Sequence, residues 1–310
     1  MTLTQIARMT DEEARAYLES IRWPDGPVCP HCGSTRATRL QGEAHREGLF
    51  KCNDCREQFT VTVGSIFESS HIPLQKWIVA FHLLCSSKKG ISSLQLQREL
   101  GFGSYRTALF MTHRIREAMI GPLAEAMTGT VEMDETYVGG KPRPKDGKVH
   151  KRGRGTSKVP VVVCVERDGE GRAVPVEHAD TKTIEAIAAK TIDKSARVMT
   201  DEWPAYRHFG KKFRGGHDVV NHGTEEFVRY ERDLALHTNT AESFFSLLKR
   251  GHYGVYHKMS RKHLKRYCHE FSFRWGQRHV SDASRTVAAL AGAGGKRLTY
   301  RQMVGKTARP

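Results

Sequence analysis

Three acidic residues of this chain occur where a fold could bring them to one point. Asp134 lies in the middle of the alternating segment TVEMDETYV, and Asp201 closes the apolar segment ARVMTD. Glu242 lies near the start of the helical pattern TAESFFSLLKRG. A carboxylate among apolar neighbours is costly unless it is paired or binds a metal ion. Carboxylates that converge from separate segments can hold two hard cations, which activate the attacking oxygen and stabilise the leaving oxygen at a phosphodiester.

The segments around these acids predict the elements that must position them. Alternation predicts a strand that places Val131 and Met133 on one face and Asp134 on the other, where Glu132 also lies. Asp201 ends a second predicted strand, and α/β sheets place their chemistry at the carboxyl ends of strands. The first two acids are therefore expected at one edge of a sheet.

Glu242 is predicted to lie on a helix, together with a basic residue. Lys249 follows it by seven residues, two turns along and on the same face. Taken singly, each acid has an ordinary alternative: Asp134 as a strand-edge charge, Asp201 as a helix cap, and Glu242–Lys249 as a solvated face. Their occurrence together, on two strands and a helix in this order, favours a shared metal site.

The segments from residue 130 onward predict three strands followed by a helix, a strand, a helix, a strand and a helix. Three consecutive strands and then alternation indicate a mixed sheet with helices on its faces. This is the order of an RNase H-like domain, so the expected fold class is α/β. Residues 141–158 are rich in Lys, Arg, Gly and Pro, which predicts a mobile basic loop.

Four of the seven cysteines form two CxxC pairs. Nineteen residues separate the first pair, Cys29 and Cys32, from the second, Cys52 and Cys55. This spacing is typical of a four-cysteine zinc site, and a redox-active CxxC is the alternative. Four protein ligands leave no open position for water, so the expected zinc is structural.

Residues 91–119 predict two helices joined by a glycine-containing turn, as in a helix-turn-helix. Tyr105 and Arg106 stand at the start of the second helix, where a recognition helix meets base edges. Arg114 and Arg116 follow as candidates for phosphate contacts. The alternative is an ordinary helical hairpin that packs on the next domain.

The charge balance favours a polyanionic partner. Fifty Lys and Arg residues against 34 Asp and Glu residues give a net charge of +16. The alternative is a basic protein without a nucleic acid partner. No segment approaches the ~20 apolar residues of a membrane span, and the N-terminus lacks the features of a signal peptide. We therefore expect no membrane partner and a cytoplasmic, nucleoid-associated protein.

The pattern predicts five parts along the chain. They are an N-terminal helix, residues 1–25; a zinc ribbon, 26–65; a helical, helix-turn-helix-like DNA-binding module, 66–128; an RNase H-like catalytic domain, 129–280; and a basic flexible tail, 281–310.

Several motifs together resemble the IS1595-family, or ISXO2-like, DDE transposases. They are CPHCGS with KCNDC, MDETYVGGK, TDEWPAY, HTNTAESFFSLLKRG and KHLKRYCHEFSFR. The resemblance implies a zinc ribbon before an RNase H-like DDE domain, with Asp134, Asp201 and Glu242 as the acids and Lys249 as their basic partner. The third position is Asn or His in some branches of the family. One departure is Gly276, which stands where the family pattern FRxNxR carries Asn.

The resemblance implies a transposase that cleaves insertion-sequence ends and joins them to target DNA. Mg²⁺ or Mn²⁺ would be held by the three acids, with His237 and Asn239 helping Lys249 to steady the scissile phosphate. The implied partners are double-stranded DNA, as transposon ends and target, and a second subunit in a homodimer on DNA. Phosphate contacts are expected from the ribbon and the basic loop, at Lys151, Arg152 and Arg154.

Two other functions fit parts of the pattern. One is an RNase H-like nuclease or resolvase that cleaves without strand transfer. The other is a non-enzymatic regulator that binds DNA through the zinc ribbon and the helical pair. A complete set of three acids favours the enzyme over the regulator.

Overall fold

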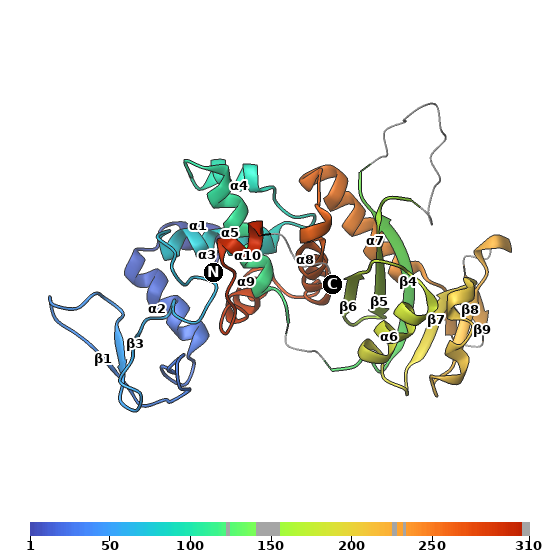
Figure 1. The fold of residues 1–310 in the computed structure, drawn as a ribbon, viewed down its shortest axis with the longest axis horizontal. Helices are drawn as coiled ribbons and strands as arrows, with labels where there is room; N and C mark the ends of the chain where they lie inside the picture. Colours follow the sequence, from blue (N-terminus) through green and yellow to red (C-terminus); the bar gives the residue numbers. More distant parts are fainter. Residues whose placement is uncertain (122–124, 141–155, 225–227, 232–233, 306–310) are drawn as a thin grey trace. The chain divides into compact units, whose positions relative to one another are not determined.

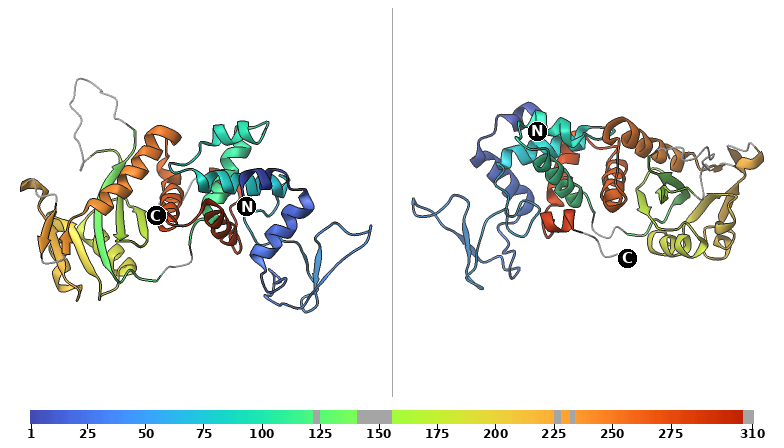
Figure 2. Two further views of the ribbon diagram at one scale, coloured as in Figure 1. Left: turned by 180° about the vertical axis from the view of Figure 1, so that it is seen from behind. Right: turned by 45° about the horizontal axis from the view of Figure 1, so that its top comes forward.

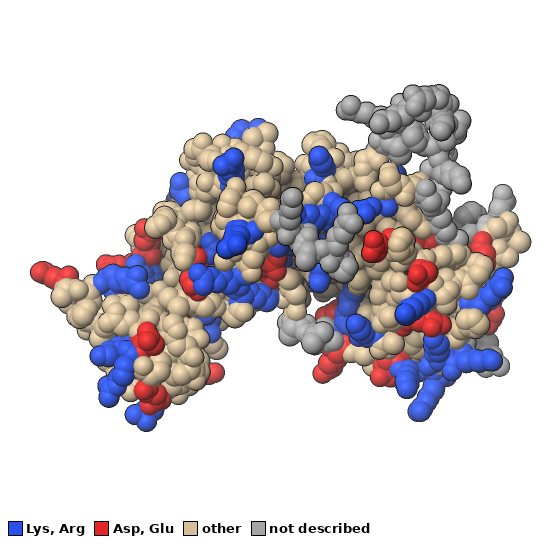
Figure 3. All heavy atoms as spheres, viewed as in Figure 1, with Lys and Arg blue, Asp and Glu red and all other residues tan. Residues whose placement is uncertain are grey.

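A computed structural model describes most of the chain, which forms two compact units (Figure 1). The described residues are 1–121, 125–140, 156–224, 228–231 and 234–305. We call residues 1–121 with 279–310 the helical unit, and residues 122–278 the sheet unit. Lys and Arg side chains lie on the viewed face of both units (Figure 3). Within the described ranges, every helix is too short or too polar to span a lipid bilayer.

The helical unit combines short helices with a small antiparallel sheet of order β1-β2-β3. Its elements are α1 (Leu3–Ala7), α2 (Asp11–Arg22), β1 (Ala37–Arg39), β2 (Phe50–Cys52), β3 (Gln58–Phe59), α3 (Leu74–Ser86), α4 (Ser93–Glu99), α5 (Tyr105–Ala118), α9 (Asp282–Ala291) and α10 (Tyr300–Val304).

Residues 1–25 form two helices instead of the single helix expected from the sequence. Thr2 caps α1 and Thr10 caps α2, each in a reciprocal capping box with the residue three positions on. A capping box satisfies amide groups at a helix start and so fixes where a helix begins. The second box, at Thr10, therefore starts a new helix.

The C-terminal segment is not a flexible tail over residues 281–305, which corrects the expectation from the sequence. Helix α9 packs on α3, where the Arg285 guanidinium donates to the Cys85 carbonyl at 2.8 Å. Ala289 and Leu290 are fully buried in this contact region. Helix α3 carries buried residues on most of its surface, and a helix that is apolar all round must be covered by other elements. Helix α9, which is rich in alanine, covers part of that surface.

The sheet unit contains a five-stranded mixed sheet of order β6-β5-β4-β7-β8, which confirms the predicted mixed α/β class. β4, β5 and β6 pair antiparallel, whereas β7 pairs parallel with β4 and β8 parallel with β7. The elements are β4 (Thr130–Val138), β5 (Val159–Glu166), β6 (Gly171–Pro175), α6 (Thr181–Thr191), β7 (Arg197–Asp201), β8 (His217–Val220), the hairpin β9 (Arg229–Glu231) and β10 (Leu234–Leu236), α7 (Asn239–Gly251) and α8 (Leu264–Gly276).

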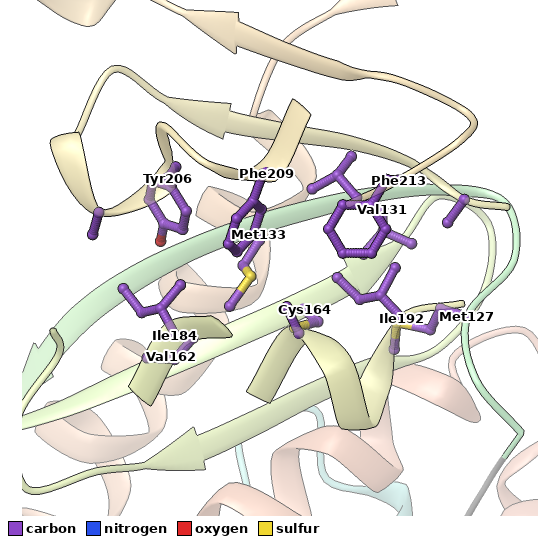
Figure 4. Close-up of a cluster of buried hydrophobic side chains, with 14 residues drawn as sticks. Met127, Val131, Met133, Val162, Cys164, Ile184, Ile192, Tyr206, Phe209 and Phe213 are labelled. Carbon is purple, nitrogen blue, oxygen red and sulfur yellow. The ribbon is translucent and has the colours of Figure 1, made fainter. Parts of the chain in front are cut away.

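Helices cover both faces of this sheet, with α6 on one face and α7 and α8 on the other (Figures 1 and 2). Val131 and Met133 of β4 point into the α6 side, as the alternation predicts (Figure 4). The neighbouring positions of β4 therefore face α7.

The segment after Asp201 forms two short 3₁₀ turns, Pro204–Tyr206 and Phe209–Lys211, where the sequence suggested a longer helix. The Tyr206 and Phe209 rings contact each other edge to face and are buried in the α6-side core. Packing of these two rings holds the chain that leaves Asp201 against the sheet.

Candidate functional site

The four paired cysteines form one cluster in the helical unit. Their sulfur atoms all lie within 4.8 Å of one another. The Cys29–Cys55 and Cys32–Cys52 sulfur distances are each 3.6 Å. A tetrahedral zinc ion with Zn–S bonds of ~2.3 Å would require S–S distances of roughly 3.8 Å. The cluster therefore has the donors and the spacing of a zinc site, and it is the only such group of metal-binding side chains among the described residues.

The two CxxC knuckles have the same backbone geometry. Gly33 and Arg56 each follow the second cysteine of a pair, and both have positive φ, 78° and 66°. Their amides donate to the carbonyls of Cys29 and Cys52, at 2.9 and 3.1 Å. Glycine adopts this conformation freely, whereas a residue with a Cβ is strained in it. The second knuckle thus carries a strained arginine where the first has glycine.

Arg56→Gly is expected to stabilise the ribbon by up to about 1 kcal/mol, because it relieves the left-handed strain. Gly33→Ala should destabilise it by a similar amount. Open space surrounds a Cβ built at Gly33, so its cost would be strain alone. Thermal unfolding of the zinc-loaded protein measures both. Destabilisation by Arg56→Gly would mean that the Arg56 side chain makes a favourable contact that outweighs the strain.

In the sheet unit, Asp134 and Asp201 lie on adjacent parallel strands. The β4–β7 pairing sets Glu132 opposite Met199, and the same register continued by two residues sets Asp134 beside Asp201. Both residues are partly buried. Asp201 also accepts a hydrogen bond from the Trp203 amide at 3.1 Å. The sheet therefore brings together the two acids that the sequence singled out.

Helix α7 adds the third acid at the same edge. Glu242 lies in its first turn and is exposed. The start of α7 is held on β4 because the Thr240 and Ala241 amides donate to the Glu132 carboxylate at 2.7 and 3.0 Å. Glu242 is thus the next residue after an anchored helix start.

The electrostatics of the site centre on Asp134. The pKa of its carboxyl is raised to about 8, mainly by burial and next by the charge of the adjacent Glu135. The charges of Asp201 and Glu242 act on it in the same direction. Converging carboxylates whose charges raise the pKa of Asp134 suit a hard divalent cation, which prefers oxygen ligands. The carboxylate oxygens of Asp134, Asp201 and Glu242 do not all lie within 4.8 Å of one another, whereas the four cysteine sulfurs do.

Asp134→Asn is expected to stabilise the metal-free protein in a pH-dependent way. A folded-state pKa of about 8, against the ordinary value of 3.8, means that Asp134 costs stability progressively as the pH rises from 4 to 8. The free energy of unfolding of the Asn variant should therefore exceed that of the wild type only slightly near pH 4. The difference should grow to the order of a few kcal/mol near pH 8. Denaturant unfolding in the presence of a chelator measures it. An advantage that does not change with pH would contradict the raised pKa.

Comparison with known proteins identifies the family. Residues 126–276 match the model of the ISXO2-like transposase domain, and residues 9–58 match a transposase zinc-ribbon domain. Over 280 residues, the chain is 30% identical to an uncharacterized protein in transposable element ISH50 of Halobacterium salinarum, with 86% of this chain and 91% of that protein covered. The chain belongs to the ISXO2-like transposase family.

Two solved structures share weaker similarity with this transposase. One is a simian T-cell lymphotropic virus intasome in complex with PP2A regulatory subunit B56 gamma, at 14% identity and a TM-score of 0.24, with 73% of this chain and 69% of that chain covered. The other is a pre-cleavage Mos1 transpososome, at 11% identity and a TM-score of 0.19, with 64% and 74% covered. Scores this low do not establish a shared fold.

The other residues expected at the transposase site occupy different environments. Lys249 is exposed on α7, with its Nζ 5.8 Å from the centroid of the Phe245 ring. His237 turns inward, with its Nδ1 3.1 Å from a Glu132 oxygen. Asn239 is partly exposed, and its amide donates to the same His237 nitrogen at 3.3 Å. His237 therefore contributes to the support beneath α7, while Lys249 remains accessible.

Two of the arginines expected to contact DNA are buried, which corrects that expectation. Arg114 and Arg116 of α5 are 4% and 0% exposed. Arg114 donates to the Glu68 carbonyl at 2.6 Å and lies over the Trp77 ring, so its role is to hold α5 on the segment before α3. Tyr105 and Arg106, at the start of α5, are exposed.

The basic loop lies outside the described residues for the most part. This holds for Lys151, Arg152 and Arg154, the three loop residues expected to contact phosphates. Gly276, the departure from the family pattern, lies at the end of α8. A Cβ built there would meet only Glu170, at an ordinary 3.8 Å, so packing does not require glycine.

Three functionally placed residues have no role in the sequence-based predictions. Glu132 and Arg167 form an ion pair beneath α7, with 2.8 Å between the Arg167 Nε and a Glu132 oxygen. The Glu132 side chain is fully buried and that of Arg167 is largely buried. The buried Tyr206 hydroxyl donates to Glu135 at 3.0 Å, and burial together with nearby acids raises its pKa well above the ordinary value. Glu132 shares a strand face with Asp134, and that alternation was the one available signal.

Proposed function

We propose that this transposase cleaves the ends of an insertion sequence and joins them to target DNA, with Asp134, Asp201 and Glu242 as its catalytic acids. The convergence of these three carboxylates at one sheet edge is the observation that carries the proposal. The family membership supports it, because the matched domain is a transposase domain.

The three acids would hold two Mg²⁺ or Mn²⁺ ions, and Lys249 would steady the scissile phosphate beside them. When bound, the ions would polarise the attacking oxygen and neutralise charge that develops on the phosphate. In the first reaction, water attacks phosphorus and the bond to the 3′ oxygen breaks, which frees a 3′-hydroxyl. In the second, that hydroxyl loses its proton and attacks a target phosphate in line. The bond from that phosphorus to its 3′ oxygen breaks, which leaves a 3′-hydroxyl on the target strand, and no covalent enzyme intermediate forms. The acids contribute position and charge complementarity.

The fold that supports this chemistry is proposed to be RNase H-like. The order β6-β5-β4-β7-β8, with an antiparallel meander followed by two parallel strands, supports it. We further propose that α4 and α5 form a helix-turn-helix-like module that binds double-stranded DNA together with the zinc ribbon. Action on two DNA ends favours a homodimer on DNA, and the expected location is the nucleoid.

A strand-transfer assay with pre-cut ends separates the proposed function from its alternatives. Purified protein is mixed with a labelled oligonucleotide that ends in a 3′-hydroxyl, a target plasmid and Mn²⁺. Joined products are expected. Cleavage of uncut ends without any joining would favour a nuclease or resolvase, and DNA binding without either reaction would favour a regulator.

The proposed DNA contact of α5 predicts an effect on salt dependence. Arg106→Ala should weaken duplex binding and reduce the slope of log K against log salt by ~0.9, which is the value for one phosphate contact. Arg8→Ala removes another exposed arginine of the same unit and should leave the slope unchanged. Fluorescence anisotropy at several salt concentrations measures both. Equal slopes for Arg106→Ala and the wild type would place the DNA contact elsewhere.

A further inference from the structure

A fully buried carboxylate, Glu132, lies beneath the start of α7. Besides the Thr240 and Ala241 amides, it accepts hydrogen bonds from the Thr240 hydroxyl and from the Arg167 Nε, each at 2.8 Å. Two carboxylate oxygens offer about four lone-pair directions, and protein donors occupy them. Glu132 therefore has no free oxygen for a metal ion and is not a fourth metal-binding acid.

The cap that α7 needs comes from this strand residue. A helix start exposes amides that require acceptors, usually the side chain of an N-cap residue in extended conformation. Thr238, the N-cap residue of α7, has φ −114° and ψ 17° and makes no side-chain capping hydrogen bond. The Glu132 carboxylate accepts from the second and third helical residues instead, and its negative charge complements the positive end of the helix dipole.

Arg167 extends this anchor to the segment that enters α7. Its guanidinium donates to the Ala235 carbonyl at 2.6 Å and to the His237 carbonyl at 3.2 Å, in addition to Glu132. Its own amide donates to the Thr130 carbonyl at 2.9 Å, at the start of β4. One ion pair thus connects β4, the turn after β5, the end of β10 and the first turn of α7.

We infer that Glu132 is a positioning residue that sets where Glu242 stands relative to Asp134. It lies two residues before Asp134 on the same strand face, and it binds the amide of the residue that precedes Glu242. The inference rests on the proposed function, in which these acids share metal ions. Groups that orient metal-binding side chains typically change metal affinity or activity by ~10–100-fold when they are removed.

Mn²⁺ binding to the full-length protein tests this role without any DNA reaction. Glu132→Ala removes the cap, and Glu132→Gln keeps its volume and one accepting oxygen but loses the charge that pairs with Arg167. The matched control is Glu270→Gln, because Glu270 of α8 is equally buried and pairs with Arg274 of the same helix and with the Tyr256 hydroxyl. Electron paramagnetic resonance gives the Mn²⁺ affinity, and hydrogen exchange of the metal-free protein reports on the amides at the start of α7.

The expected result is a Kd for Mn²⁺ that rises ~10–100-fold in Glu132→Ala and less in Glu132→Gln. Hydrogen exchange of the amides at the start of α7 should also accelerate more in Glu132→Ala than in Glu132→Gln. Glu270→Gln should lower the thermal stability without changing either quantity. If Glu132→Ala does not fold, Glu132→Gln decides the outcome alone.

Unchanged Mn²⁺ affinity in a folded Glu132 variant, or an equal loss in Glu270→Gln, would overturn the positioning role. Asp134→Asn separates this outcome from failure of the proposed function. If Asp134→Asn binds Mn²⁺ as tightly as the wild type, the metal site itself is wrong. If Asp134→Asn loses Mn²⁺ and the Glu132 variants do not, only the positioning inference fails.

Discussion

Asp134→Asn and Asp201→Asn are each expected to abolish end cleavage and strand transfer. A metal ion that neutralises transition-state charge is worth several kcal/mol, and each ~1.36 kcal/mol is tenfold in rate, so the loss should be about a thousandfold or more. DNA binding should be retained or improved, because either change removes a negative charge near phosphate. Gel assays of cleavage and joining, run beside a binding assay, measure the three effects.

Asp218→Asn is the matched control for these two variants. Asp218 lies on β8, next to β7, and its carboxylate pairs with the Arg197 guanidinium at 2.6 Å, so it is an acid of the same sheet whose charge is already matched by an arginine. It should keep its activity. Glu242→Gln should also reduce turnover, though less, because some branches of the family carry the amide residue Asn at this position. If both Asp variants still cleave and join DNA, the catalytic assignment is wrong and a DNA-binding regulator becomes the better account.

Loss of zinc is expected to unfold the ribbon. The three strands β1, β2 and β3 have only three, three and two residues, which is too little sheet to be stable alone. Metal binding supplies the missing free energy, about 10–16 kcal/mol for structural zinc in small domains. Cys29→Ser or Cys52→Ser should therefore lose the metal together with the fold of this region.

Metal analysis and limited proteolysis test this prediction. The wild type should carry about one zinc per chain, as expected for a single four-cysteine site, and the ribbon should resist protease until a chelator is added. Cys85→Ala is the control, because Cys85 is equally buried but lies on α3, outside the cluster. A freshly purified wild type without zinc, or a Cys52→Ser variant as protease-resistant as the wild type, would show that the ribbon folds without the metal.

The sequence by itself determined the features that depend on residue type and local spacing. Two CxxC pairs nineteen residues apart predict a metal cluster, since the geometry of a knuckle is local. Alternation along residues 130–138 predicts which β4 residues face the α6-side core, because the period of a strand is two. The three acids were found by their chemistry and order, as charges in segments that otherwise predict buried strands and an amphipathic helix.

Only the tertiary structure decided the features that depend on contacts between distant segments. Glu132 meets Thr240 across 108 positions of sequence, so nothing local distinguishes a helix cap from a solvated acid. Arg114 is buried because Trp77 and the Glu68 carbonyl cover it, whereas arginine is usually exposed. Residues 282–291 form an ordered helix because α3 offers an apolar surface to α9. In each case the free energy comes from a partner that the local sequence does not contain.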